Sequence, residues 1–193
     1  MWHESKVKEY IKIHLTKDRY NHSLGVMKTS EELAIYYGID PSKARMAALC
    51  HDCAKYFSAN ELINKARGSG QIISSVYYKS PQLLHGIVGA YIAKELFHVE
   101  DEDVLNAIKY HTTGREAMST LEKIVYIADC IEPARSYKGV KELRSLAYDD
   151  LDKAILKSFE DTIMYILSRG SIIHVDTIKA RNYLLMSKKL NIN

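Results

Sequence analysis

Signals that start helices recur along almost the whole sequence, and they leave little room for strands. Asp40-Pro41 and Ser80-Pro81 each place a capping residue before a proline, which is well accepted at the first helical position. Two further pairs have the spacing of a capping box: Ser58 with Glu61, and Ser119 with Glu122. The pattern predicts an all-α chain of about nine helices.

The expected helix boundaries follow from these starts and from the stops between them. The helices delimited in this way span residues 40–56, 82–97, 101–111, 119–132, 149–169 and 176–189. Gly38, Gly114 and Gly170 fall where helices should end, as residues free to adopt a positive φ. Strand evidence is thin: only the short apolar pieces 72–73 and 76–78 could be extended.

The size and charge of the chain exclude several classes of protein. Its 193 residues suit one domain, which buries about 70% of its unfolded surface. A net charge of +3 lacks the concentrated basic character of a nucleic-acid binder. No segment approaches the roughly 18 uninterrupted apolar residues of a membrane helix, and residues 1–10 lack the apolar core of a secretion signal. We expect a cytoplasmic protein without nucleic-acid or membrane partners.

Six residues that can bind metals stand in helical contexts, and two of them are adjacent. They are His22, His51, Asp52, His85, His111 and Asp129. Imidazole suits iron and zinc, whereas carboxylate suits harder ions such as manganese. A carboxylate can also bridge two cations with separate oxygens, so Asp52 beside His51 is the natural shared ligand. The six residues fall on five different predicted helices or at their ends, with His51 and Asp52 on the same one, which is how a helical bundle assembles a metal site.

Simpler interpretations exist for each candidate. A single histidine on an apolar face is more often a hydrogen-bonded core residue than a ligand, whereas an aspartate such as Asp129 is rarely buried in an apolar run without a partner. The other histidines have polar surroundings near termini or helix ends, and we expect surface or capping roles for them: His3, His14, His98 and His174. Cys50 and Cys53 form a C-x-x-C, but Cys130 alone cannot complete a zinc site, so buried core thiols are favoured.

The six residues in this order resemble the HD phosphohydrolase superfamily in its two-metal form. Five segments carry the resemblance: RYNHSLGV at 19–26, HDCAK at 51–55, LHG at 84–86, YHTTG at 110–114 and ADCIEPAR at 128–135. Together they look like the YqeK-type branch, the bacterial HD-domain hydrolases that cleave diadenosine tetraphosphate symmetrically. The resemblance extends to NYLL at 182–185, although Val175 stands where we would expect a proline.

The resemblance implies a single-domain HD-type helical bundle over residues 1–193. Its motifs lie within 18–135, its C-terminal helices, 140–190, pack onto them, and a dinuclear metal site lies in the core. Iron is the expected metal, with manganese and zinc as alternatives. One ion would take His22, His51, Asp52 and Asp129. The other would take His85, His111 and the second oxygen of Asp52.

The implied reaction is attack of a metal-bridging hydroxide on a phosphate, releasing two ADP molecules. Asp52 and Lys55 are the expected catalytic residues, and Glu132 is expected to orient a ligand. An arginine guanidinium can donate two hydrogen bonds to the oxygens of one phosphate group. The expected substrate-binding residues are Arg19, Lys55, Thr112, Thr113, Gly114, Arg115 and Arg135. For each cation, a solvated surface residue is the simpler interpretation. A homodimer is compatible with the sequence.

Two other functions remain open at this point. The chain could be a different HD phosphohydrolase that acts on nucleoside mono-, di- or triphosphates, or a non-catalytic module that senses nucleotides. A cyclic-dinucleotide phosphodiesterase is disfavoured because Thr112-Thr113-Gly114, and not Gly-Tyr-Pro, follows His111. A sensing module would be expected to have lost ligands, whereas all six are present.

Overall fold

Helices account for all the regular secondary structure among residues 2–190, which the computed structural model describes, together with the side chains of residues 2–187. The helices are α1 (Glu4–His14), α2 (Lys17–Tyr36), α3 (Pro41–Cys50), α4 (Ala59–Gly68), α5 (Ser75–Lys79), α6 (His85–Glu95), α7 (Glu102–Tyr110), α8 (Thr120–Ile131), α9 (Val140–Asp149), α10 (Leu151–Ser168) and α11 (Val175–Leu190). A short 3-10 segment, η1 (Pro81–Leu84), leads into α6. The all-α prediction is therefore confirmed for the described residues, although the helices outnumber the predicted nine.

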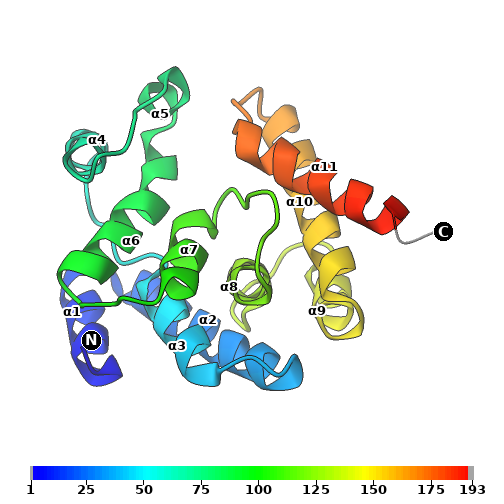
Figure 1. Ribbon diagram of the computed structural model, residues 1–193, viewed down its shortest axis with the longest axis horizontal. Coiled ribbons are helices and arrows are strands. Elements are labelled where there is room, and N and C mark those ends of the chain that lie inside the picture. The colour runs from blue at the N-terminus through cyan, green and yellow to red at the C-terminus, as the bar shows by residue number, and fades with distance from the viewer. Residues whose placement is uncertain (1, 191–193) are drawn as a thin grey trace.

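Helix α8 forms the centre of the bundle. It packs against α2, α3, α7, α9 and α10 (Figure 1). Its residues from Ile124 to Ala128 are buried without interruption, so every face of this helix is covered. The carboxylate of Asp129, which follows directly, is thereby held at the middle of the molecule.

Small residues let the helices that carry histidines approach one another closely. Gly86 on α6 lies so near α7 that a Cβ atom added to it would stand 2.6 Å from the backbone oxygen of Lys109. Ala47 and Ala48 on α3 are completely buried, in a helix that packs against α2, α6, α7 and α8. Close packing of backbones brings side chains from four separate helices within reach of one point.

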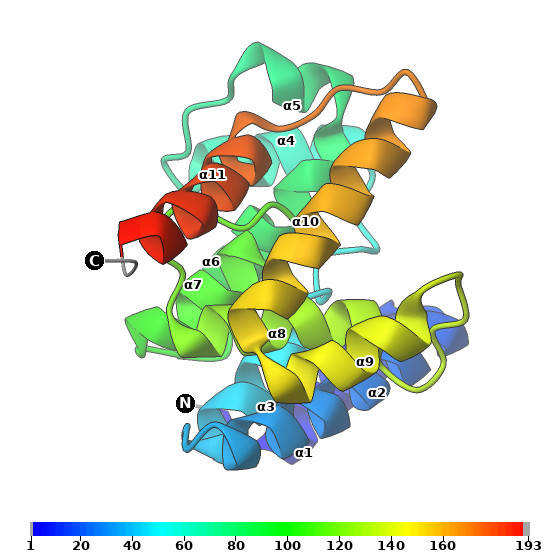
Figure 2. The same cartoon turned by 90° about the vertical axis from the view of Figure 1, so that its right-hand side faces the viewer.

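The C-terminal helices cover the side of α8 that faces away from α7. Helices α9 and α10 both contact α8, and α11 packs along α10 (Figures 1 and 2). Phe159 on α10 is fully buried and its ring lies 4.9 Å from that of Tyr126 on α8. No helix among the described residues is both long enough and apolar enough to cross a bilayer.

Most of the predicted caps are confirmed. Ser58 and Ser119 form complete capping boxes with Glu61 and Glu122, and Asp101 accepts hydrogen bonds from Asp103 N and Val104 N at the start of α7. The three glycines predicted to end helices have positive φ angles: Gly38, Gly114 and Gly170. The capping signals therefore placed these boundaries correctly.

Three predicted segments differ from the structure. The helix expected to continue through Tyr56 ends at Cys50, because the chain then makes tight turns in which Cys53 N bonds Cys50 O and Lys55 N bonds Asp52 O. The segment after Ser80 begins as a 3-10 turn, and α6 proper starts only at His85. Residues 76–78 are not extended but belong to the short helix α5.

Candidate metal centre

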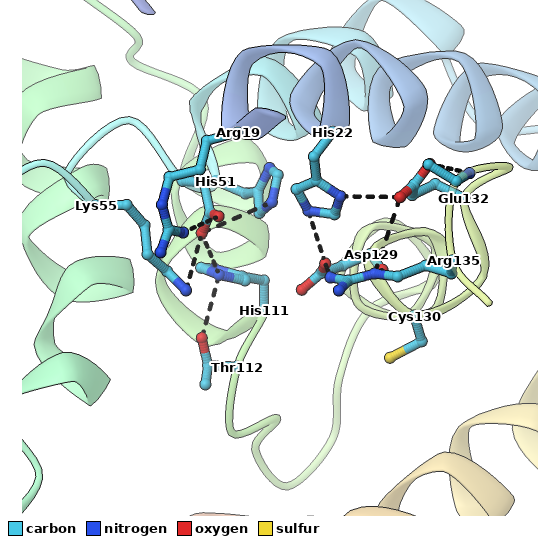
Figure 3. A network of polar contacts seen from close by, with 12 residues as sticks. Arg19, His22, His51, Lys55, His111, Thr112, Asp129, Cys130, Glu132 and Arg135 are labelled. Atoms are coloured by element: carbon cyan, nitrogen blue, oxygen red, sulfur yellow. Dashed lines mark hydrogen bonds and ion pairs between the residues drawn. The ribbon is translucent and has the colours of Figure 1, made fainter. Parts of the chain in front are cut away.

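All six predicted metal ligands converge in one place (Figure 3). His22 projects from α2, His51 and Asp52 follow the end of α3, and His85 begins α6. His111 caps the end of α7, and Asp129 lies near the end of α8. Two sets among them bring one ligand atom each within 4.8 Å of one another: His22, His51 and Asp129, and His51, Asp52 and His111.

The same local hydrogen bond orients three of the four imidazole rings. The Nδ1 atoms of His51, His85 and His111 donate to the carbonyl oxygens of Ala48, Gln82 and Ile108, each three residues earlier, at 2.6, 2.5 and 2.7 Å. Because a carbonyl oxygen only accepts, each Nδ1 atom must carry the ring proton. Each Nε2 atom therefore presents a free lone pair, which is the tautomer that binds a metal.

These lone pairs face one another and the carboxylate of Asp52. The Nε2 atoms of His85 and His111 lie 2.8 Å apart, and they stand 3.2 and 3.5 Å from Asp52 Oδ1. The Thr112 hydroxyl lies 3.2 and 3.1 Å from the same two nitrogens and can donate to only one of them. His51 Nε2 and Asp52 Oδ1 are buried without a hydrogen-bond partner. Such a cluster of buried electron-rich atoms is stable only beside positive charge.

The other half of the cluster is built around His22. Its Nε2 atom lies 3.0 Å from Asp129 Oδ1, and its Nδ1 atom lies 3.1 Å from Glu132 Oε1. Glu132 is itself fixed, because Ala134 N donates to its other oxygen at 2.7 Å. The predicted orienting role of Glu132 therefore has a direct counterpart in the structure.

The protonation states of the cluster suit cation binding. Burial lowers the pKa of His51 to about 4 and also lowers that of His85. Burial alone would raise the pKa of Asp52, but the adjacent imidazoles, with His51 foremost, hold that pKa well below its ordinary value. Neutral imidazole and ionised carboxylate are the forms that ligate metals. Burial lowers the pKa of His22, but the hydrogen bonds to Asp129 and Glu132 raise it overall, so metal binding there would displace a proton. The residues thus fit a divalent metal in donor type, and His51, His85 and Asp52 fit it in charge as well.

A cavity of about 340 Å³ opens onto the cluster and is rimmed by cations. Its lining consists of Asp18, Arg19, His22, Asp52, Lys55, Asp129, Glu132, Ala134 and Arg135. Arg19 Nη1 lies 3.7 Å from Asp52 Oδ2, and Lys55 Nζ lies 3.6 Å from Asp52 Oδ1. Arg135 Nη2 lies 2.6 Å from Asp129 Oδ1 (Figure 3). Three of the predicted substrate-binding cations therefore border the cluster.

The remaining predicted substrate-binding residues lie in different positions. Thr112 contacts the histidine pair, whereas the hydroxyl of Thr113, a buried residue, donates to Gly114 O. Gly114 has a φ of +65° and packs against Phe159. Arg115 forms a two-pronged ion pair with Glu122 and lines a separate cavity beside Tyr183. The structure thus does not bring Arg115 to the cluster.

The other histidines and the cysteines lie apart from this centre. His3 and His98 are exposed, in agreement with the prediction, and His14 stacks on Tyr10. His174 caps α11 by accepting from Asp176 N, in agreement with the expected surface or capping role, and it is only 7% exposed. Tyr77 packs over its ring and buries it. Cys50 and Cys53 are fully buried free thiols, as predicted.

Apart from Glu132, sequence reasoning missed the groups that support the ligands. Gly25 is one, since a Cβ atom added there would stand 2.6 Å from Glu132 Oε2. The carbonyl oxygens of Ala48, Gln82 and Ile108 are the others. Their only signal in the sequence is their place three residues before a histidine at a helix end.

Comparison with known proteins identifies the family. The model of the HD domain matches residues 19–134, which contain all six converging residues. The chain belongs to the HD domain family. Among its HD-domain relatives, the symmetrical bis(5′-nucleosyl)-tetraphosphatase of Halalkalibacterium halodurans is 44% identical over 95% of this chain and 98% of its own length. The protein of the same name from Bacillus subtilis is 40% identical, over 91% of this chain and 94% of its own length.

The fold of this HD domain also matches a solved structure. A Clostridium acetobutylicum protein, described as a predicted HD superfamily hydrolase involved in NAD metabolism, superimposes with a TM-score of 0.95. The two are 48% identical, and the match covers 97% of this chain and 99% of the other. The helical bundle expected from the sequence resemblance is thereby confirmed.

Proposed function

We propose that this HD-domain protein is a metal-dependent hydrolase that cleaves diadenosine tetraphosphate into two ADP molecules. The observation that carries the proposal is the buried convergence of Nε2 lone pairs on Asp52 Oδ1 beneath a cavity rimmed by three cations. Relatives that carry the name of the symmetrical hydrolase share 44% and 40% identity over more than nine-tenths of this chain. Both lines of support lead to a hydrolase of polyphosphate esters of nucleosides.

Two ions are proposed to occupy the cluster, with iron as the preferred metal and manganese or zinc as alternatives. His22, His51, Asp52 and Asp129 would hold one ion, and His85, His111 and Asp52 would hold the other. Four imidazoles with two carboxylates is a donor set that suits these borderline metals. Bound there, the cations supply a water of lowered pKa and neutralise charge on phosphoryl oxygens.

Side chains and backbone carbonyls of this protein together position the metal ligands and the substrate. Glu132 holds the ring of His22 through Nδ1, and backbone carbonyls hold the other three rings. Arg19, Lys55 and Arg135 are proposed to grip the phosphate chain, because each lies within 4 Å of a ligand carboxylate at the cavity. The same three side chains also stabilise the negative charge that develops on the departing diphosphate.

We treat residues 1–193 as a single HD domain, because α9 and α10 pack directly on α8, the helix that carries Asp129. Association into a homodimer stays a prediction. Neither point alters the chemistry proposed for the site.

Product analysis tests the function. Metal-loaded protein incubated with diadenosine tetraphosphate should release ADP alone, two molecules per substrate, as separated by anion-exchange chromatography. Equal amounts of AMP and ATP would contradict symmetric cleavage. Release of inorganic phosphate from nucleoside mono- or triphosphates, without cleavage of the dinucleotide, would identify a different HD phosphohydrolase. Binding of nucleotides without any turnover would identify a sensing module.

A further inference from the structure

A second and larger cavity adjoins the metal centre, with one residue common to both. It has a volume of about 660 Å³ and lies between the loop after α8 and helices α9 and α10. Its lining is Cys130, Arg135, Tyr137, Lys138, Leu143, Ser158, Asp161, Thr162 and Tyr165. Arg135 also lines the cavity over the metal ligands. A molecule that contacts Arg135 can therefore extend into either space.

The connection between the two cavities is short. Asp129 and Cys130 are neighbours on α8, and successive residues of a helix point about 100° apart. Asp129 consequently faces the ligand cluster, while Cys130 points toward α10 (Figure 3). The Arg135 guanidinium lies 2.6 Å from Asp129 Oδ1 and stands at the junction between these two directions.

The cavity over the metal ligands is at the small end of the range for ligand-binding cavities. Ligand cavities in proteins commonly measure about 300–1,000 Å³, and this one, at about 340 Å³, is lined almost entirely by charged side chains. Such a lining suits phosphates but offers no apolar face to a nucleobase. A nucleotide whose phosphates bind at the ligands must place its nucleoside elsewhere.

The second cavity has the chemistry that a nucleoside requires. Two aromatic rings, Tyr137 and Tyr165, and the side chain of Leu143 provide apolar surface. The ring of Tyr137 is held in place, because its hydroxyl donates to Cys130 O at 2.9 Å. Stacking of a base on an aromatic side chain strengthens binding and tolerates any base, because every base has a π-face. The polar groups of Asp161 and Thr162 lie in the same lining and can bond ribose hydroxyls.

The other cavities near the centre are less suitable. The one that includes Thr112 has a volume of only about 90 Å³, well below the range of ligand cavities. The one beside Arg115 shares no lining residue with the cavity over the ligands.

We propose that the cavity between the loop after α8, α9 and α10 is a nucleoside subsite, in which Tyr165 and Tyr137 contact the base and Arg135 binds the phosphate next to the ribose. The subsite rests on the proposed function, since it takes one nucleoside end of that substrate. It assigns a specific role to the C-terminal helices, which lie largely outside the span that the family model matches.

Calorimetric titration of the metal-loaded full-length protein tests the subsite, with ADP and inorganic diphosphate as the two probes. Wild-type protein should bind ADP more tightly than diphosphate. Tyr165→Ala should weaken ADP binding about tenfold and change diphosphate binding by less than about twofold. Tyr137→Ala should act in the same direction, whereas Tyr137→Phe, which keeps the ring, should retain most of the ADP affinity. Tyr36→Ala is the matched control, since Tyr36 is 60% exposed on α2 and Tyr165 is 66% exposed.

Several outcomes would overturn the subsite. These are equal weakening of both probes by Tyr165→Ala, no weakening of either, or a wild-type protein that does not favour ADP over diphosphate. The proposed function fails by a different result, namely wild-type protein that releases no ADP from diadenosine tetraphosphate. Protein that binds ADP through Tyr165 yet does not cleave the dinucleotide would keep the subsite and refute the symmetric hydrolysis.

Discussion

The Nε2 atoms of His85 and His111 lie 2.8 Å apart, and because Nδ1 of each ring donates to a backbone carbonyl, the neutral form of each ring has a lone pair at Nε2. Two lone pairs at this distance repel unless a cation lies between or beside them. Imidazole nitrogens at right angles around one ion, each about 2.1 Å from it, would stand about 3.0 Å apart. The spacing of this pair therefore corresponds to two ligands of a common metal.

Divalent metal should stabilise the folded protein. At a free metal concentration a hundred times the dissociation constant, the gain is about 2.7 kcal/mol, which raises the melting temperature of a chain of this size by about 5–10 °C. Differential scanning calorimetry of chelator-treated protein, with and without added iron, manganese or zinc, measures the shift. An identical melting temperature under all these conditions would argue against a metal centre.

Removing the charge of Asp52 should abolish most metal binding and activity. Asp52→Asn keeps the side-chain shape but loses the carboxylate that faces His85 and His111. We expect metal content measured by elemental analysis to fall, and the hydrolysis rate to fall by at least about a hundredfold. His98→Asn is the control, since His98 is exposed and has a positive φ that asparagine tolerates. A similar loss in the control would mean that the site lies elsewhere.

Glu132 should affect metal affinity through His22. Glu132→Gln weakens the acceptor of the His22 Nδ1 proton, and loss of such a partner typically lowers metal affinity by about 10–100-fold. Gly25→Ala should act in the same direction, because its Cβ would stand 2.6 Å from Glu132 Oε2. Gly68→Ala provides the matched control, with no atom near the added methyl group. Metal titration that gives one affinity for all four proteins would contradict this positioning role.

Asp101 should make the stability depend on pH in the acid range. A hydrogen bond from Lys43, at 2.7 Å, lowers the pKa of this N-cap carboxyl in the folded state. Its contribution is therefore fully present above the pKa of the unfolded chain, about 3.9, and is lost as the pH falls through the lower folded pKa. Asp101→Asn keeps the cap but removes the charge. Its free energy of unfolding in urea should therefore be lower than that of the wild type at pH 6, and this difference should shrink below about pH 4. A deficit that persisted unchanged at low pH would not come from this ion pair.

The C-x-x-C motif should be chemically inert in the folded protein. Cys50 and Cys53 are fully buried, and burial raises the pKa of both thiols. Thiolate is the reactive form, so an aromatic disulfide reagent should modify neither thiol until the chain is unfolded. Cys130 is partly exposed, and burial still raises its pKa to about 12, so it should react slowly. Rapid native labelling of Cys50 or Cys53 would revive a redox function for the motif.

Local signals in the sequence predicted the helix boundaries wherever capping decided them. Ser119, Asp101 and Gly114 act within one turn of their own position, and the structure has them in the predicted roles. The end of α3 at Cys50 was mispredicted because no glycine or proline stands between Cys50 and Tyr56 to end the helix. Only the tertiary environment, in which Ala54 is also buried, favours turns over further helix there.

The candidate site was predictable in its ligands but, apart from Glu132, not in the groups that support them. His22 and Asp129 were recognisable as motif residues, yet they are 107 positions apart and meet only because α2 packs on α8. Gly25 gave no signal by itself, whereas Glu132 and Arg135 in the loop after α8 were predicted from the motif that contains them. The ion pair between Arg115 and Glu122 likewise depends on a side-chain conformation that no motif specifies.

The backbone carbonyl oxygens of Ala48, Gln82 and Ile108 orient the imidazole rings of three histidines. Any amino acid other than proline can present the same oxygen from a helical turn. The orientation of the three imidazoles therefore does not constrain which side chains stand at these positions. At Ala48 and Ile108 burial in the core sets that limit, whereas the exposed Gln82 can be exchanged without turning the ring of His85.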